Sequence, residues 1–261
     1  MTLDSLNIRK CSLPELQDIF RAIRFIRLKI ESSKKQIMKD YEQVKKNMLL
    51  KSRKHLAHDL IIRPRYEFRE EEKREYILET IEGEESLFFN LDSLIIDLKR
   101  NIEFVMKFIA MSRKIKLKKF SLENIIDQLS SKYIGEKCEF IKFLTIHYPK
   151  YIIFLSSELV WLKQLNAKRT ILIHEGILNR TDKYSVRFYW TANSDEKTEP
   201  QIEAPEIAIF SHSVSSWVVF QIQKLDLFLK ESYKIMDEFL DFQSTFDKKN
   251  KGIKFERQNQ L

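Results

Sequence analysis

The sequence predicts an all-α protein, a helical bundle with a long N-terminal helical extension and a small β insertion. Three observations lead to this prediction. The 261 residues include only four glycines and five prolines, so few positions interrupt a helix. Long stretches repeat apolar residues every three or four positions, which is the spacing of one helix face. One segment, 184–190, instead alternates and is rich in aromatic residues, as strands are.

The first long helix is predicted over 14–59, because Pro14 follows a capping serine and no later glycine or proline interrupts the segment. The sequence Arg-Pro-Arg at 63–65 marks its end. Its apolar stripe is predicted to consist of Ile19, Ile23, Ile26, Ile30, Ile37, Tyr41, Val44 and Met48.

A second long helix is predicted over 70–111, with Gly83 as its weak point. The mixed charges of 67–75 are interpreted as a solvated helix face. Two long helices of opposite course cover each other's apolar stripes when they pack as an αα-hairpin. The second stripe is predicted to consist of Phe88, Leu91, Leu94, Ile95, Leu98, Ile102, Val105 and Phe108.

Shorter elements are expected in the rest of the chain. Helices are predicted over 121–132, 136–147 and 149–176. After the strand at 184–190, residues 201–210 favour a second strand, which Pro205 restricts to the edge of a sheet. A last helix is predicted over 213–246. These elements suggest three regions, namely an extension (1–83), a helical domain (84–246) and a flexible tail (247–261).

The net charge of +8 is concentrated near the N-terminus, where the first 60 residues hold fourteen Lys/Arg against seven Asp/Glu. A basic surface attracts phosphate, so RNA is an expected partner. A second basic cluster is a candidate nucleic-acid-binding segment and consists of Arg113, Lys114, Lys116, Lys118 and Lys119. The alternative is that both segments are solvated helix faces without a ligand.

Several classes of site are not indicated. The two cysteines, Cys11 and Cys138, are far apart and suggest free thiols in a reducing compartment. His55 and His58 lack the further ligands of a metal site, and no glycine-rich phosphate loop is present, so we expect no metal and no cofactor. We find neither a signal pattern nor an apolar run of membrane-spanning length, so we expect a cytoplasmic protein with no membrane partner.

The segment 169–174, Arg-Thr-Ile-Leu-Ile-His, is the most informative part of the chain. Winding it on a helix places Arg169 in the apolar sector, near Leu165. Asn166, Thr170 and His174 form a polar stripe along the edge of that sector. Because a guanidinium is rarely placed among apolar residues without a partner or a purpose, this segment is the candidate site.

An arginine and a histidine at this spacing, on a helix of an all-α bundle, resemble the signature of the HEPN superfamily. That signature is an arginine, four to six residues and a histidine, and here Glu175 follows His174 directly, as is common in such proteins. The resemblance covers about 84–246. The sequence departs at Thr170, where the superfamily most often has Asn, Asp or His, and this departure concerns activity more than fold.

The resemblance implies a metal-independent endoribonuclease whose composite site is formed by a homodimer. Arg169 would stabilise the charge on the phosphorane, and His174 would transfer protons, which leaves a 2′,3′-cyclic phosphate. Asn166, Thr170 and Glu175 would support them. The resemblance further implies a toxin or defence effector that a regulatory protein partner restrains. The alternative is a non-catalytic module, in which Arg169 and His174 hold a helix interface and the basic N-terminal helix binds RNA or a protein.

Overall fold

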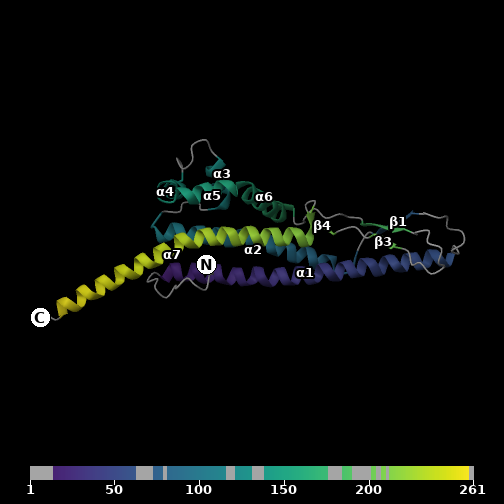
Figure 1. Cartoon of the computed structure of the whole chain (residues 1–261), viewed down its shortest axis with the longest axis horizontal. Coiled ribbons are helices and arrows are strands. Elements are labelled where there is room, and N and C mark those ends of the chain that lie inside the picture. The colour runs from purple at the N-terminus through teal and green to yellow at the C-terminus, as the bar shows by residue number, and fades with distance from the viewer. Residues whose placement is uncertain are drawn as a thin grey trace. The chain divides into compact units, whose positions relative to one another are not determined.

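The computed structural model is predominantly helical, which confirms the all-α class (Figure 1). It describes residues 14–62, 73–78, 81–115, 121–130, 138–175, 184–189, 201–203, 207–209 and 212–258. Contacts divide the chain into two compact units that interleave in sequence. Unit 1 comprises Met1–Ser32, Leu94–His174 and Gln221–Leu261, and unit 2 comprises Ser33–Ser93 and Glu175–Phe220. Within the described residues, none of the helices has the length and apolar character needed to cross a membrane.

The two long N-terminal helices form the predicted antiparallel pair. Helix α1 spans Pro14–Ile62 and α2 spans Glu84–Ser112, and the predicted apolar stripes of both are buried. In unit 1, the Asn101 amide donates to the carbonyl of Ile23 at 3.0 Å, and Lys29 pairs with Asp97 at 2.8 Å. As numbers rise along α1 they fall along α2, so the helices run in opposite directions.

In unit 2, the same two helices are joined by polar contacts that converge on one carboxylate. Asp40 of α1 accepts hydrogen bonds from the Asn90 amide at 2.8 Å, from the Ser86 hydroxyl at 3.1 Å and from the Gln36 amide at 2.7 Å. Further along α1, the Asn47 amide donates to the carbonyl of Glu82 at 2.9 Å. These contacts keep the antiparallel course found in unit 1.

The start of the second helix differs from the prediction. Residues 73–78 form strand β1 (Lys73–Leu78), and α2 begins only at Glu84. Gly83 has φ +89°, a left-handed conformation that ends any helix arriving from the N-terminal side and that other residues rarely adopt. The charged segment 67–75 was therefore wrongly interpreted as a helix face in its last three residues, while 67–72 lie outside the described residues.

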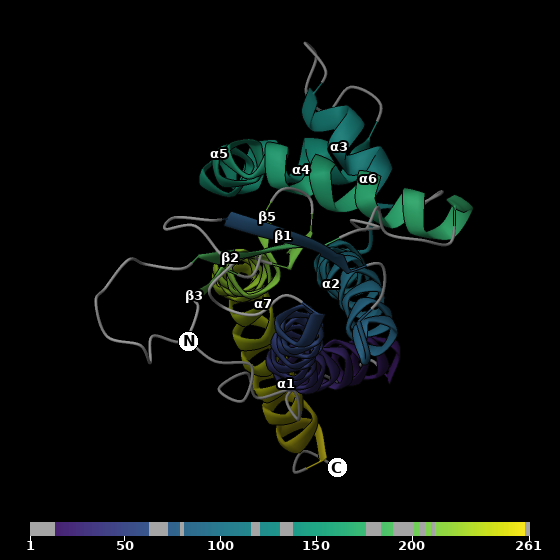
Figure 2. The same ribbon diagram turned by 90° about the vertical axis from the view of Figure 1, so that its right-hand side faces the viewer.

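Strand β1 belongs to a small antiparallel sheet in the order β1-β2-β3 (Figure 2). Strand β2 (Tyr184–Tyr189) confirms the predicted aromatic strand, and Tyr76 of β1 faces Val186 of β2. Strand β3 (Gln201–Glu203) lies at the edge, in the segment where an edge strand was expected, although Pro205 itself is outside the described residues. A two-stranded ribbon of β4 (Ala208–Ile209) and β5 (His212–Ser213) precedes the last helix.

In the described part of the chain, four helices lie between α2 and β2. They are α3 (Leu122–Ser130), α4 (Glu139–His147), α5 (Pro149–Ser157) and α6 (Leu159–Glu175). The single helix predicted from Pro149 onward is thus two helices, which separate at Glu158 (φ −91°, ψ 3°). The Ser157 hydroxyl donates to the carbonyl of Phe154 at 2.7 Å, and such a local bond competes with helix continuation.

The last helix, α7, spans Val214–Gln258 and is longer than predicted. Ser213 caps it, since its hydroxyl oxygen accepts the Ser216 amide hydrogen at 3.2 Å. The expected end near Phe246 is wrong, because 247–258 also have a helical backbone. Their composition is polar but contains a single glycine and no proline, so nothing in it stops a helix.

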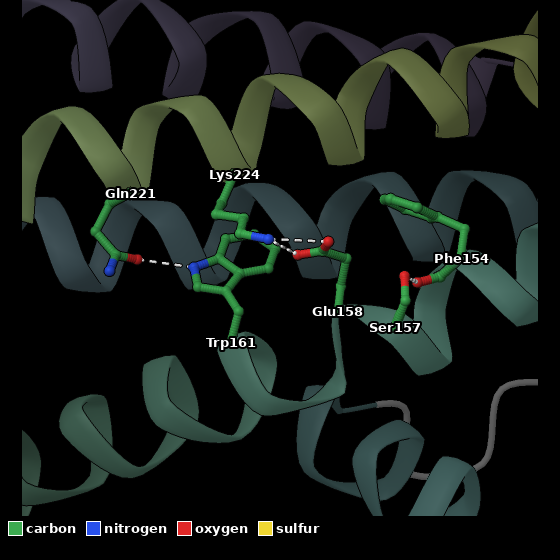
Figure 3. Close-up of polar contacts among 6 residues, drawn as sticks. All are labelled: Phe154, Ser157, Glu158, Trp161, Gln221 and Lys224. Atoms are coloured by element: carbon green, nitrogen blue, oxygen red, sulfur yellow. Dashed lines mark hydrogen bonds and ion pairs between the residues drawn. The ribbon is translucent and has the colours of Figure 1, made fainter.

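Helix α7 runs antiparallel to α5 and α6 within unit 1, and three buried or half-buried polar contacts among the described residues join them. Figure 3 shows the contacts of Glu158 with Lys224 and of Trp161 with Gln221. The Tyr151 hydroxyl lies 2.7 Å from the Ser232 hydroxyl. Lys224 donates to both oxygens of Glu158, at 2.7 and 3.0 Å. The Trp161 indole donates to Gln221 at 2.8 Å. These contacts fix the position of α6, which carries the candidate site.

The Glu158–Lys224 pair predicts a measurable coupling. Glu158 is largely buried and Lys224 is partly exposed, so removing either partner leaves a poorly solvated charge. We expect Glu158→Gln and Lys224→Met each to lower the free energy of unfolding by about 1–3 kcal/mol. In a double-mutant cycle from urea unfolding, the double variant should lose less than the sum of the two. Additive losses would show that the pair contributes nothing.

Asp92 of α2 predicts a pH-dependent stability in unit 2. Burial raises its pKa to about 6, and its Oδ1 has no hydrogen-bond partner among the described residues. Because the folded-state pKa lies above the unfolded one, the stability from this group is fully present below about pH 4 and is lost as pH rises through about 6.

We therefore expect Asp92→Asn to stabilise the protein at pH 7 by about 1 kcal/mol, a value reduced because the carboxyl is only half-buried. The gain should disappear at pH 4. Urea unfolding at both pH values measures it, with Asp127→Asn, at an exposed position of α3, as the control. An equal gain at both pH values would contradict the carboxyl titration as its cause.

Candidate functional site

Helix α6 has a buried face and an exposed face. Trp161, Leu162 and Leu165 are buried, as the sequence predicted, whereas Val160 and Ala167 are exposed. Arg169 is half-buried, seven residues after Leu162 and therefore on the inner side of the helix. The predicted placement of Arg169 in the apolar sector is thus what the structure shows.

Arg169 interacts electrostatically with a buried lysine of α2. Lys99 is only 7% exposed. Burial lowers the pKa of Lys99, the carboxylate of Glu103 raises it, and the positive charge of Arg169 lowers it further. Arg169 itself forms no ion pair or side-chain hydrogen bond with any described residue. Two cations of unit 1, Arg169 of α6 and Lys99 of α2, therefore interact with each other.

The carboxylates of Glu103 and Glu123 both raise the pKa of Lys99, and Glu103 makes two direct contacts. Its Oε1 lies 3.8 Å from the Lys99 ammonium, which is a long ion pair, and accepts the Leu122 amide hydrogen at 3.1 Å. The second contact caps the start of α3. With Glu123, this part of unit 1 holds two carboxylates beside the two cations, and Arg169 forms an ion pair with neither of them.

The supporting residues of the motif are placed differently from one another. Asn166 is half-buried, and its Oδ1 is a buried acceptor without a partner among the described residues. Thr170 is exposed, and its hydroxyl donates to the carbonyl of Asn166 at 3.0 Å. The Thr170 hydroxyl therefore donates its hydrogen bond within its own helix. The side-chain oxygen of Asn166, one turn before Arg169, accepts none from the described residues.

The backbone of α6 continues through His174 and Glu175, whose side chains lie outside the described part of the structure. The helical repeat places position 174 on the exposed face, seven residues after Ala167. Positions 169 and 174 are separated by about 140° around the helix axis. Positions 169 and 174 thus belong to different faces of one helix.

The predicted basic cluster after α2 is described only in part. Lys116, Lys118 and Lys119 lie outside the described residues. Arg113 donates to the Tyr148 hydroxyl at 2.6 Å, and its guanidinium carbon lies 5.9 Å from the Tyr148 ring centre and 5.6 Å from that of Phe239. Arg113 thus stacks inside unit 1, whereas Lys114 is exposed.

Sequence reasoning missed Lys99 and Glu103. The available signal was the position of Lys99 between Leu98 and Ile102 in the predicted apolar stripe of α2, where a lysine is as conspicuous as Arg169 is in α6. Lys168, the residue before Arg169, is also half-buried, and burial lowers its pKa to about 8. Among the described residues, no three metal-ligating side chains lie together.

Compared with protein-family models, with curated proteins and with solved structures, the chain matches none. The HEPN resemblance therefore depends on the 169–174 motif and on the helical architecture.

The proximity of Arg169 to Lys99 predicts an electrostatic response. Because the charge of Arg169 lowers the pKa of Lys99, we expect Arg169→Gln to raise that pKa. A pH titration of the Lys99 Cε resonance by NMR in lysine-labelled protein measures the change. Thr170→Val, which removes a hydroxyl but no charge from the same helix, should leave the titration unchanged. An unshifted Lys99 in the Arg169→Gln variant would show that the two charges do not interact.

Proposed function

We propose that this protein is an HEPN-like, metal-independent endoribonuclease, in which Arg169 binds the scissile phosphate and His174 transfers protons. The observation that carries the proposal is the half-buried guanidinium of Arg169 on the inner side of α6. Arg169 has no anionic partner among the described residues, and the nearby Lys99 shares Glu103 with the start of α3. Poorly solvated cations favour the binding of an anion, and a phosphodiester provides one.

The chemistry needs no group that the chain lacks. A neutral imidazole removes the proton of the 2′-hydroxyl, the 2′-oxygen attacks phosphorus, and the bond from phosphorus to the 5′-oxygen breaks. A protonated imidazole gives that leaving oxygen its proton, and the product strand ends in a cyclic phosphate. The planar guanidinium of Arg169 suits the charge that builds up on the phosphorane oxygens.

The exposed face of α6 supports the involvement of a second copy of the chain. Position 174 shares that face with Val160 and Ala167, which are exposed and carry no charge. Two such faces allow a close helix–helix approach. The proposed base and acid are both imidazoles, and α6 carries one histidine, so a second copy is also the natural source of the second imidazole. A homodimer is therefore part of the proposal.

One observation favours the second candidate, a non-catalytic RNA-binding or protein-interaction module. Thr170 stands where the superfamily most often has a residue able to hold a phosphate or a proton, and its hydroxyl is bonded back to Asn166. If this loss has ended catalysis, Arg169 still binds phosphate and the protein binds RNA without cutting it.

The test is an RNA digest in the presence of EDTA. We expect wild-type protein to cut single-stranded RNA and leave cyclic phosphate ends. His174→Ala and Arg169→Ala should each lower the cleavage rate about 100-fold or more, because proton transfer and charge stabilisation each contribute on that order. Unchanged circular dichroism would show that both variants fold.

His147→Ala is the matched control, since this exposed histidine of α4 contacts the ring of Phe143 and has no place in the proposed site. It should cut like wild type. Undiminished cutting by His174→Ala would overturn the proposal. RNA binding without products at any pH would overturn catalysis in favour of the non-catalytic module.

A further inference from the structure

We propose that the part of α1 in unit 2 binds the phosphodiester backbone of RNA through a basic ridge formed by four exposed residues, Lys35, Lys39, Lys46 and Arg53. The inference deepens the proposed function, on which the choice of RNA depends. It concerns a surface separate from the 169–174 motif, which belongs to α6 of unit 1.

The ridge follows from helix geometry. Relative to Lys35, the other three residues deviate by no more than about 40° around the helix axis, because their separations of 4, 11 and 18 residues are close to whole turns. Their spacing along the axis gives a straight line of about 27 Å from Lys35 to Arg53. Duplex nucleic acid carries one phosphate per about 3.4 Å of each strand, so this length matches several successive phosphates.

The charges of the ridge are not neutralised within the protein. The side chains of the four ridge residues form no ion pair or hydrogen bond in the part of the chain that the structure describes. Over 33–55 the sequence has eight Lys/Arg and two Asp/Glu. Of the two acids, Asp40 accepts hydrogen bonds from α2, and only Glu42 is exposed on the ridge side.

In the first part of α1, which belongs to unit 1, several basic residues form ion pairs. Arg21 pairs with Asp18 at 3.1 Å, Arg27 with Asp226 at 2.5 Å and Lys29 with Asp97 at 2.8 Å. A helix that merely needed solubility could pair its lysines with acids three or four residues away throughout. The difference between these paired residues and the four ridge residues indicates that the ridge has an external partner.

An anionic membrane is the competing partner, and the surface does not favour it. Helices that lie on membranes carry large apolar residues beside their basic ones. Over the described residues 33–55, the one exposed large apolar side chain is Leu50, about 60° away from Lys35 around the axis. A charged ridge without an apolar border suits a phosphate chain in water rather than a lipid surface.

The test compares two triple variants of equal charge, both made in the His174→Ala protein so that no cleavage occurs. The ridge variant carries Lys35→Gln, Lys39→Gln and Lys46→Gln. The control variant changes three exposed lysines of unit 1, by Lys107→Gln, Lys142→Gln and Lys230→Gln. Glutamine is a good helix former, so both should fold. Binding of labelled single-stranded RNA of about 20 nucleotides is measured from low to moderate salt, alongside DNA of the same sequence.

We expect the ridge variant to bind RNA roughly tenfold more weakly or worse at low salt, and the slope of log affinity against log salt to become shallower by about 2, since three phosphate contacts are lost. The control variant should bind almost like its parent. DNA binding should weaken similarly, because phosphate contacts do not read the 2′-hydroxyl.

Equal RNA binding by the ridge and control variants would overturn the proposal, and so would a loss confined to DNA. A third result against it would be unchanged RNA binding together with lost binding to phosphatidylserine vesicles, which would assign the ridge to membranes. The outcome does not depend on cleavage, because every protein compared is inactive by design. A result against RNA binding by the ridge can therefore be distinguished from a result against the nuclease proposal.

Discussion

The burial of Lys99 is the constraint on which the candidate site depends. An ammonium group at this depth requires a compensating charge, and Glu103 supplies it from one turn further along α2. The same carboxylate accepts a hydrogen bond from the Leu122 amide in the first turn of α3. Its negative charge therefore interacts with both the Lys99 ammonium and the start of α3. Arg169 adds a second positive charge, and Glu123 a second negative one, to the charges that act on Lys99. Beside its buried apolar residues, the inner side of α6 thus carries a cation that interacts with other charges of unit 1.

The sequence was sufficient to predict the elements whose apolar residues repeat over many turns. Both long stripes were found because burial of one helix face leaves a periodic signal that no other structure produces. The strand β1 was missed because its alternation is short and its preceding residues are charged. Its conformation depends on pairing with β2, more than a hundred residues away. The break at Glu158 was missed for a related reason, since no glycine or proline marks it and the carboxylate is held by Lys224 of α7.

The sequence likewise predicted some residues of the candidate site and missed others. Arg169 could be singled out because its conflict with the apolar sector is visible in α6 alone. The interaction of Arg169 with Lys99 could not be predicted, because the two residues belong to different helices and no periodic pattern in the sequence connects them. The orientation of the motif followed from helix geometry once α6 was known to continue through His174, because that length decides which positions lie on the exposed face.

The convergence of three donors on Asp40 has a consequence for how the α1–α2 pair is assembled. Apolar stripes alone would allow one helix to slide along the other, because an isoleucine one turn further along fills nearly the same space between them. A shift of one turn, about 5.4 Å, would separate the Asp40 carboxylate from Ser86 and Asn90, which would lose this acceptor, and would leave Asp40 with the Gln36 amide of its own helix. Asp40 therefore fixes how α1 and α2 are aligned along their axes in unit 2. It contributes more to this alignment than to the stability of the pair.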